Sequence, residues 1–344
     1  MFSLDKILRK NIKNLTPYSS ARDEYSGTDA VFLDANENPF NGPYNRYPDP
    51  LQTEVKKRIS RIKEVRIENI FLGNGSDEAI DLLIRAFCEP RTDNIVSIEP
   101  SYGMYEVCAR ISDVDFKKVL LTEDFQLKTG EILKTINKNT KLIFLCSPNN
   151  PTGNSFNKHD IITILQNFDG LVIIDEAYID FSTQESLLSV LDESKNLVVL
   201  QTFSKAWGLA GIRLGMAFAG DDIVKVLNKI KYPYNINSLT LEKANEALIN
   251  DRTKKIWITE ILKAKELLTD ELSNIPVVTK VYPSDANFIL VRVSFAKNIY
   301  KYLVDKKIIV RDRSNVILCE GCLRITVGTK DENSLLIDAL KEYV

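Results

Sequence analysis

The stretch KLIFLCSPNNPTGNSFNKHDIITILQNFDGLVIID (141–175) decides the fold class of this chain. It opens with an unbroken apolar run (141–146), passes through a polar turn into a helical pattern (158–168), and closes with a second apolar run (171–175). Short apolar runs that alternate with helical patterns are typical of parallel strands whose two faces are both covered by helices. The stretch therefore predicts a strand–helix–strand unit of an α/β fold.

The same alternation continues on both sides of this stretch. Further apolar runs occupy residues 69–73, 94–100, 116–121, 196–201 and 214–220. Together they predict a large α/β domain (36–240) that contains a mainly parallel seven-stranded sheet flanked by helices. After residue 238 short strands and helices follow in a different order, which predicts a smaller α+β domain (241–344).

The composition is that of an ordinary globular protein. The chain has 344 residues, of which 44% are hydrophobic and 27% charged, with a net charge of -2. This balance argues against a nucleic-acid partner, because nucleic-acid binders usually carry a basic excess. No apolar segment approaches the roughly 20 residues that span a bilayer, and the N-terminus lacks the apolar stretch of a signal peptide. We therefore expect a cytoplasmic protein with no membrane partner.

The cysteines and the histidine narrow the chemistry further. The five cysteines are Cys88, Cys108, Cys146, Cys319 and Cys322. Their odd number and apolar surroundings predict buried free thiols. The C-x-x-C at 319–322 lacks the second pair or the histidines of a zinc site, so no metal is expected. The single histidine, His159, stands among charged residues at a predicted helix start, which predicts a surface residue and argues against a Ser-His-Asp site.

Polar segments follow several of the predicted strands, at the edge where open parallel sheets bind ligands. GNGSDE (73–78) would place the backbone N–H groups of Gly75, Ser76 and Asp77 at a helix start, which suits a phosphate. The alternative is that Ser76 only caps the helix. In SPNNPTG (147–153), Asn150 precedes a proline and should be extended, with its side chain available to a ligand.

An acid and a lysine follow the next two strands. Asp175 closes the run 171–175, and Tyr178 follows three residues later. A buried carboxylate is costly unless a cation or donor compensates, although an N-cap role is the alternative. Lys205 lies in the glycine-rich TFSKAWGLAGIRLG (202–215), where a desolvated lysine near another cation becomes a nucleophilic amine. A surface lysine with a buried stem is the alternative there.

This ordered set of groups suits pyridoxal phosphate. The cofactor needs a lysine for its aldehyde, a carboxylate for its pyridine nitrogen, donors for its phenolate oxygen and an anion site for its phosphate. No G-x-G-x-x-G segment follows a strand, so a nicotinamide cofactor is not expected.

At this point the chain resembles a known family, the histidinol-phosphate aminotransferases, which are class II pyridoxal-phosphate enzymes of fold type I. The matching segments are LDANENP (33–39), RYPDP (46–50), GNGSDE, PSYGMY (100–105), SPNNPTG, DEAYIDF (175–181), TFSKAWGLAGIRLG and GCLRITVGT (321–329). They cover nearly the whole chain in order. The lysine segment and SPNNPTG are shared with many fold type I aminotransferases, whereas NLTPY (14–18) and the arginines near the C-terminus are more specific.

The resemblance implies an activity, a cofactor and site residues. Lys205 would be the Schiff-base lysine and proton shuttle, and Asp175 would pair with the pyridinium nitrogen. Asn150 and Tyr178 would hold the phenolate oxygen, and Tyr102 would stack on the ring. The cofactor's phosphate would be held by Gly75, Ser76, Asp77, Thr202, Ser204, Arg213 and Tyr47 of the neighbouring subunit. The implied reaction moves an amino group from glutamate to imidazole acetol phosphate, giving histidinol phosphate and 2-oxoglutarate in histidine biosynthesis.

The resemblance also implies a substrate anchor and a homodimer. Arg324, Arg311 and Tyr18 would hold the substrate phosphate, with Asn36 near the substrate. Because guanidinium groups suit both phosphate and carboxylate, glutamate could use the same anchor. For Arg311 the alternative is a surface charge. The N-terminal segment (1–35) would pack with the small domain and with the dimer partner.

Other activities stay open on the same scaffold. One is an aromatic amino-acid aminotransferase that uses the same arginines for a carboxylate, and another is a phosphothreonine decarboxylase. A non-enzymatic binding or regulatory module is disfavoured because the cofactor positions are intact.

Overall fold

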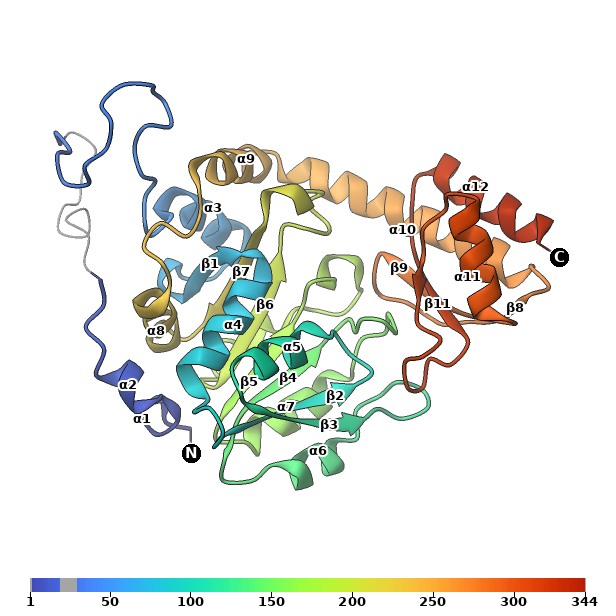
Figure 1. The fold of residues 1–344 in the computed structure, drawn as a ribbon, viewed down its shortest axis with the longest axis horizontal. Coiled ribbons are helices and arrows are strands. Elements are labelled where there is room, and N and C mark those ends of the chain that lie inside the picture. Colours follow the sequence, from blue (N-terminus) through green and yellow to red (C-terminus); the bar gives the residue numbers. More distant parts are fainter. Residues whose placement is uncertain (1, 19–29, 344) are drawn as a thin grey trace.

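The computed structural model describes residues 2–18 and 30–343 of the chain, which contain two β-sheets (Figure 1). The larger sheet has seven strands in the order β1-β7-β6-β5-β4-β2-β3, and the smaller has four in the order β10-β11-β9-β8. The strands of the larger sheet are β1 (Ile70–Asn74), β2 (Asn94–Glu99), β3 (Asp115–Leu120), β4 (Thr140–Cys146), β5 (Leu171–Asp175), β6 (Leu197–Thr202) and β7 (Leu214–Ala219).

The larger sheet confirms the predicted architecture. All seven apolar runs are strands, and β2 to β6 pair in parallel, while β7 runs antiparallel to both β6 and β1. Successive side chains of each strand enter opposite hydrophobic clusters: Leu142 and Phe144 pack on one face of the sheet, Ile143 and Leu145 on the other. Because both faces of the inner strands are buried, these strands are apolar at nearly every position, whereas the edge strand β3 is largely exposed and carries charged side chains.

Helices cover the two faces of this sheet in separate layers. One layer contains α4 (Gly75–Phe87), α5 (Met104–Ile111) and α8 (Asp221–Ile230). The other contains α3 (Thr53–Lys63), α6 (Thr129–Thr135) and α7 (Lys158–Gln166). Short 3-10 turns lie at η2 (Ile67–Asn69), η3 (Ile179–Phe181), η4 (Leu187–Val190) and η5 (Ala210–Ile212). The helices on both faces act as crossover connections that return the chain to the start of the next parallel strand. The parallel strands therefore all end at the same edge of the sheet.

The start of the chain packs on the large sheet's helices. Helices α1 (Leu4–Ile7) and α2 (Lys10–Lys13) bury Ile7 in the α4 cluster, and Arg9 donates to the Arg85 carbonyl at 2.9 Å. For residues 2–13 this differs from the expected packing against the small domain. The rest of that domain assignment, including contact with a second subunit, stays a prediction.

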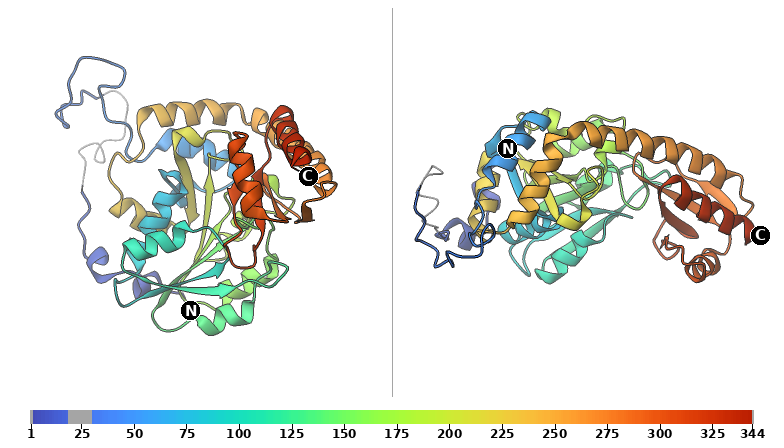
Figure 2. Two further views of the ribbon diagram at one scale, coloured as in Figure 1. Left: turned by 45° about the vertical axis from the view of Figure 1, so that its right-hand side comes forward. Right: turned by 90° about the horizontal axis from the view of Figure 1, so that it is seen from above.

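The C-terminal part forms the smaller, antiparallel sheet. It contains β8 (Val278–Val281), β9 (Phe288–Val293), β10 (Arg311–Asp312) and β11 (Cys322–Thr326), with α11 (Ala296–Asp305) and α12 (Lys330–Glu342). Helix α9 (Ser238–Ile249) packs against α3, and the long helix α10 (Asp251–Ser273) runs from the large sheet to the small one (Figure 2). The second, smaller unit predicted from the change of pattern is therefore present.

Three further predictions concern single residues and segments. All five cysteines are free and buried, as predicted. His159 is exposed at the start of α7. Among the residues that the structure describes, no helix is both long enough and apolar enough to cross a membrane.

Candidate active site

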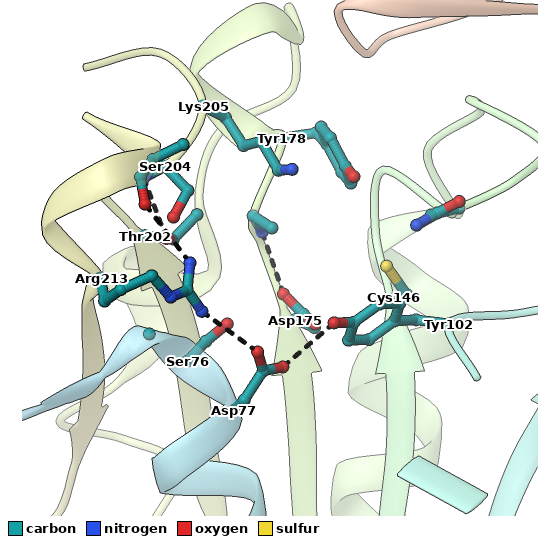
Figure 3. Close-up of a pocket in the computed structure, with 14 residues that line it drawn as sticks. Ser76, Asp77, Tyr102, Cys146, Asp175, Tyr178, Thr202, Ser204, Lys205 and Arg213 are labelled. Atoms are coloured by element: carbon teal, nitrogen blue, oxygen red, sulfur yellow. Dashed lines mark hydrogen bonds and ion pairs between the residues drawn. The ribbon is translucent and has the colours of Figure 1, made fainter. Parts of the chain in front are cut away.

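A cavity of about 210 Å³ lies where β4, β5 and β6 end and helix α4 begins (Figure 3). Its lining includes every residue predicted to hold the cofactor except Tyr47, together with Cys146, Ala177 and Ala210. These residues come from segments far apart in the sequence. They meet because parallel strands of one sheet end at the same edge.

The start of helix α4 forms one end of the cavity. Gly75 has φ +71°, and its N–H donates to the Arg213 carbonyl at 2.8 Å, which ties the helix start to β7. Gly215 of β7 has no room for a side chain, because a Cβ there would lie 2.1 Å from the Ser76 backbone nitrogen. Ser76 lies inside the helix and Asn74 occupies the capping position without a side-chain hydrogen bond. Because the Gly75 N–H is already donated to Arg213, the first-turn donors left for a ligand are those of Ser76 and Asp77, and the alternative of Ser76 as a mere cap is wrong.

The Arg213 side chain stands beside this helix start. Its Nη2 lies 3.5 Å from Asp77 Oδ2, and Thr202 and Ser204 lie next to it in Figure 3. A cation, hydroxyl groups and helix N–H donors together make an anion site.

Asp175 occupies the floor of the cavity at the end of β5 and is only 3% exposed. Its Oδ2 accepts a hydrogen bond from the Tyr105 hydroxyl at 2.7 Å, and its Oδ1 accepts from the Ala177 N–H at 3.1 Å. Burial raises the pKa of Asp175 to about 6, and the Tyr105 bond opposes that rise. The 3-10 turn that follows begins at Ile179 behind Tyr178, so Asp175 is not a helix cap.

Sequence reasoning missed Tyr105. The residue is 1% exposed, stacks on Phe144 with ring centroids 4.8 Å apart, and meets Tyr102 edge-on at 5.5 Å. A usable signal was present: Tyr105 follows Tyr102 by one helical turn, so the two rings can share a face.

Lys205 enters the cavity from the loop after β6 (Figure 3). Its Nζ lies 5.5 Å from the centroid of the Tyr178 ring and has no hydrogen-bond partner within the described residues. Burial lowers the pKa of Lys205, and the Arg324 charge lowers it further, while Asp175 acts in the opposite direction. The amine is thus more easily deprotonated than a surface lysine, as the sequence predicts.

Arg324 reaches the site from β11 of the small sheet. Its Nη1 donates to Asn150 Oδ1, and its guanidinium lies 5.2 Å from the centroid of the Phe288 ring. Its Nε is buried without a hydrogen-bond partner among the described residues. Arg311, on the paired strand β10, is the register partner of Arg324 and is exposed. The unpaired N–H of Arg324 beside the cavity is therefore suited to bind an anionic ligand.

The residues present fit pyridoxal phosphate. The start of α4, where Gly75 and Ser76 pack on Gly215, forms a phosphate cradle. It offers N–H donors for a phosphate, and it leaves no space for a side chain at Gly215. Asp175, buried and raised in pKa, suits a protonated ring nitrogen, because a cation stabilises its charged form. Tyr178 is buried and its pKa is raised by burial, so its hydroxyl stays a donor at neutral pH.

Comparison with known proteins identifies the family. Residues 23–340 match the family profile for Aminotransferase class I and II. A curated relative from Cytophaga hutchinsonii, a histidinol-phosphate aminotransferase, is 57% identical over 99% of both chains. The chain belongs to the class I and II aminotransferases. The resemblance seen in the sequence motifs is thereby confirmed.

Solved structures share the fold of this aminotransferase. The histidinol-phosphate aminotransferase from Clostridium acetobutylicum has a TM-score of 0.80 at 26% identity and covers 87% of this chain and 91% of its own. The enzyme from Sinorhizobium meliloti, solved with pyridoxal-5'-phosphate, has a TM-score of 0.80 at 23% identity, with 86% and 82% covered. The fold class predicted from the sequence is therefore that of known aminotransferases.

Three predicted site residues lie outside the cavity of this aminotransferase. Tyr47 stacks on Tyr234 with centroids 4.4 Å apart, and Asn36 lines the same surface hollow as Tyr47. Tyr18 is 76% exposed. Tyr47 is predicted to act at the neighbouring subunit's site, and Tyr18 and Asn36 near the substrate; all three roles stay predictions.

Proposed function

We propose that this aminotransferase transfers an amino group from L-glutamate to imidazole acetol phosphate, giving L-histidinol phosphate and 2-oxoglutarate in a reversible reaction. The observation that carries the proposal is the arginine pair of the small sheet, Arg324 and Arg311, which stands beside the lysine cavity without a carboxylate partner among the described residues. The relative from Cytophaga hutchinsonii, 57% identical over 99% of both chains and named a histidinol-phosphate aminotransferase, supports it independently.

The anion-binding residues would set the substrate's position. The N–H groups of Ser76 and Asp77, together with Arg213, would bind the cofactor's phosphate. Arg324 with Arg311 would bind the substrate's phosphate or carboxylate. Asn150 already accepts from Arg324, so the same amide can donate its N–H toward the cofactor's phenolate oxygen. Anchors at both ends hold the substrate's α-carbon near Lys205.

The remaining residues would move or hold protons. Pyridoxal phosphate, when bound, supplies an electron sink for the electron pair released at the substrate's α-carbon. Lys205, with its pKa lowered by burial, would accept the α-proton and return it at C4′. Asp175 would keep a proton on the ring nitrogen, and the Tyr178 hydroxyl would donate to the phenolate oxygen.

Replacing Lys205 with Ala tests the mechanism. We expect Lys205→Ala to bind pyridoxal phosphate without the covalent absorbance band and to lose turnover by about 10⁴-fold or more, because general acid–base and covalent catalysis are both removed. Lys225→Ala, on the exposed face of α8, is the matched control and should keep full activity. Full turnover in Lys205→Ala would refute the mechanism.

A substrate comparison tests the reaction. Turnover with histidinol phosphate should exceed that with phenylalanine or phosphothreonine. A preference for phenylalanine would favour an aromatic amino-acid aminotransferase, and carbon dioxide release from phosphothreonine would favour a decarboxylase.

We further propose a homodimer in the cytoplasm. The segment around Tyr47 exposes apolar side chains, with Val31 86%, Leu33 88% and Phe40 77% exposed, and Figure 1 shows it looping away from the large sheet. A second subunit would cover these side chains and receive Tyr47 at its own active site. The free thiols of the chain are consistent with a reducing compartment.

A further inference from the structure

Three arginines of the small sheet lie on one face. Arg311 and Arg324 are register partners across β10 and β11, and the Arg313 N–H donates to the Cys322 carbonyl at 2.9 Å. Leu323, between Cys322 and Arg324, points to the other face and is buried in the core of the small sheet. Since side chains alternate along paired strands, Arg313 is on the same side as Arg311 and Arg324.

Arg313 has no counter-ion within the part of the chain that the structure describes. Its Nε is buried without a hydrogen-bond partner. Burial lowers the pKa of Arg313, and the charges of Arg324 and Arg311 lower it further. The neighbouring acid, Asp312, instead accepts from the Ser314 N–H at 2.7 Å. Grouping cations in this way is unfavourable unless an anion joins them.

Arg313 also faces the site itself. It lines a hollow of about 220 Å³ together with Tyr102 and Asn150, which both line the cofactor cavity as well. Glu106, which also lines the hollow, is already engaged by Lys118 at 2.9 Å and Arg110 at 2.6 Å. The hollow therefore adjoins the cofactor cavity, with Tyr102 and Asn150 as shared wall residues, and the charge of Arg313 is left for a ligand.

We propose that Arg313 is a third guanidinium of the substrate anion site and makes that site prefer a dianionic phosphate monoester to a carboxylate. This inference rests on the proposed function. A phosphate monoester carries about -1.5 to -2 charge at neutral pH and three acceptor oxygens, whereas a carboxylate carries one charge and two oxygens. A third guanidinium therefore adds more to phosphate binding than to glutamate binding.

Kinetics of the two half-reactions test this role. In Arg313→Gln we expect the KM for histidinol phosphate to rise about tenfold or more, because a charge-assisted hydrogen bond is lost. The KM for glutamate should change by less than about threefold, since Arg324 and Arg311 remain. Arg313→Lys should restore part of the phosphate affinity. Equal changes in both KM values, or no change in either, would overturn the proposal.

Two further measurements separate the rival explanations. If Arg313 merely pairs with Glu106 when the hollow closes, Glu106→Gln will reproduce the Arg313→Gln effect; we expect it to leave both KM values unchanged. Calorimetric titration of the holoenzyme with inorganic phosphate should show weaker binding in Arg313→Gln than in the wild type. Unchanged phosphate binding would contradict the role of Arg313, whereas wild-type protein that binds phosphate but does not turn over histidinol phosphate would contradict only the proposed reaction.

Discussion

At the scale of single residues, the contact between Tyr105 and Asp175 controls the acid on the cavity floor. The hydroxyl of Tyr105 donates to Asp175 at 2.7 Å inside a fully buried environment. Burial disfavours the carboxylate, while this hydrogen bond favours it. The ionisation of Asp175 at neutral pH, on which its pairing with a protonated ring nitrogen depends, is therefore a balance between these two effects.

Tyr105→Phe should disturb that balance. We expect the pKa of Asp175 to rise above its present value of about 6, because the donor that favours the charged form is gone. The acid limb of the pH profile of kcat/KM should then move to higher pH, with activity recovering as pH rises through the new pKa.

Unfolding of the cofactor-free protein gives an independent check. The folded-state pKa of Asp175 is raised, so its charge destabilises the fold above pH 6, and this penalty disappears as pH falls toward the ordinary value. Denaturant unfolding should show Tyr105→Phe losing about 1–3 kcal/mol at pH 8 and less at pH 5. An equal loss at both pH values would indicate a packing defect. Tyr282→Phe, another buried tyrosine that packs on Phe125, is the control.

At the scale of elements, the approach of helix α4 to strand β7 creates the phosphate cradle. A Cβ on Gly215 would lie 2.1 Å from the Ser76 nitrogen and 2.2 Å from the Gly75 carbonyl carbon. Both atoms belong to the backbone, so the helix start itself would have to move.

Gly215→Ala should consequently weaken cofactor binding. We expect the dissociation constant for pyridoxal phosphate, measured by equilibrium dialysis, to rise about tenfold or more, and the free energy of unfolding to fall by about 1–3 kcal/mol. Gly211→Ala is the matched control, because no heavy atom lies within 4 Å of the Cβ it would add. Wild-type affinity in Gly215→Ala would show that the cradle is not the phosphate site.

At the scale of the whole molecule, the homodimer that we propose would complete each active site with Tyr47 of the other chain. In this chain Tyr47 lines a surface hollow with Asn36 and does not line the cofactor cavity. If each subunit contributes Tyr47 to the site of the other, catalysis depends on dimerisation, because each site then needs both chains.

Hybrid dimers test this arrangement. A purified hybrid of one Lys205→Ala subunit and one Tyr47→Ala subunit should have about half the activity of the wild-type dimer, because one of its two sites combines both intact residues. If Tyr47 acts within its own subunit, the hybrid will instead have no more than half the activity of the Tyr47→Ala dimer. The Lys205→Ala homodimer serves as the inactive reference.

The amino-acid sequence by itself determined the larger sheet, its helical layers and the cofactor set around Lys205 and Asp175. Strands buried on both faces must be apolar throughout, and groups that follow parallel strands meet at one edge, so local patterns carry this information. Only the tertiary structure decided that Tyr105 contacts Asp175 and that Arg313 joins Arg324. Those contacts depend on packing between helices and sheets that are distant in sequence. The local pattern of apolar and polar residues does not tell which distant side chains will meet.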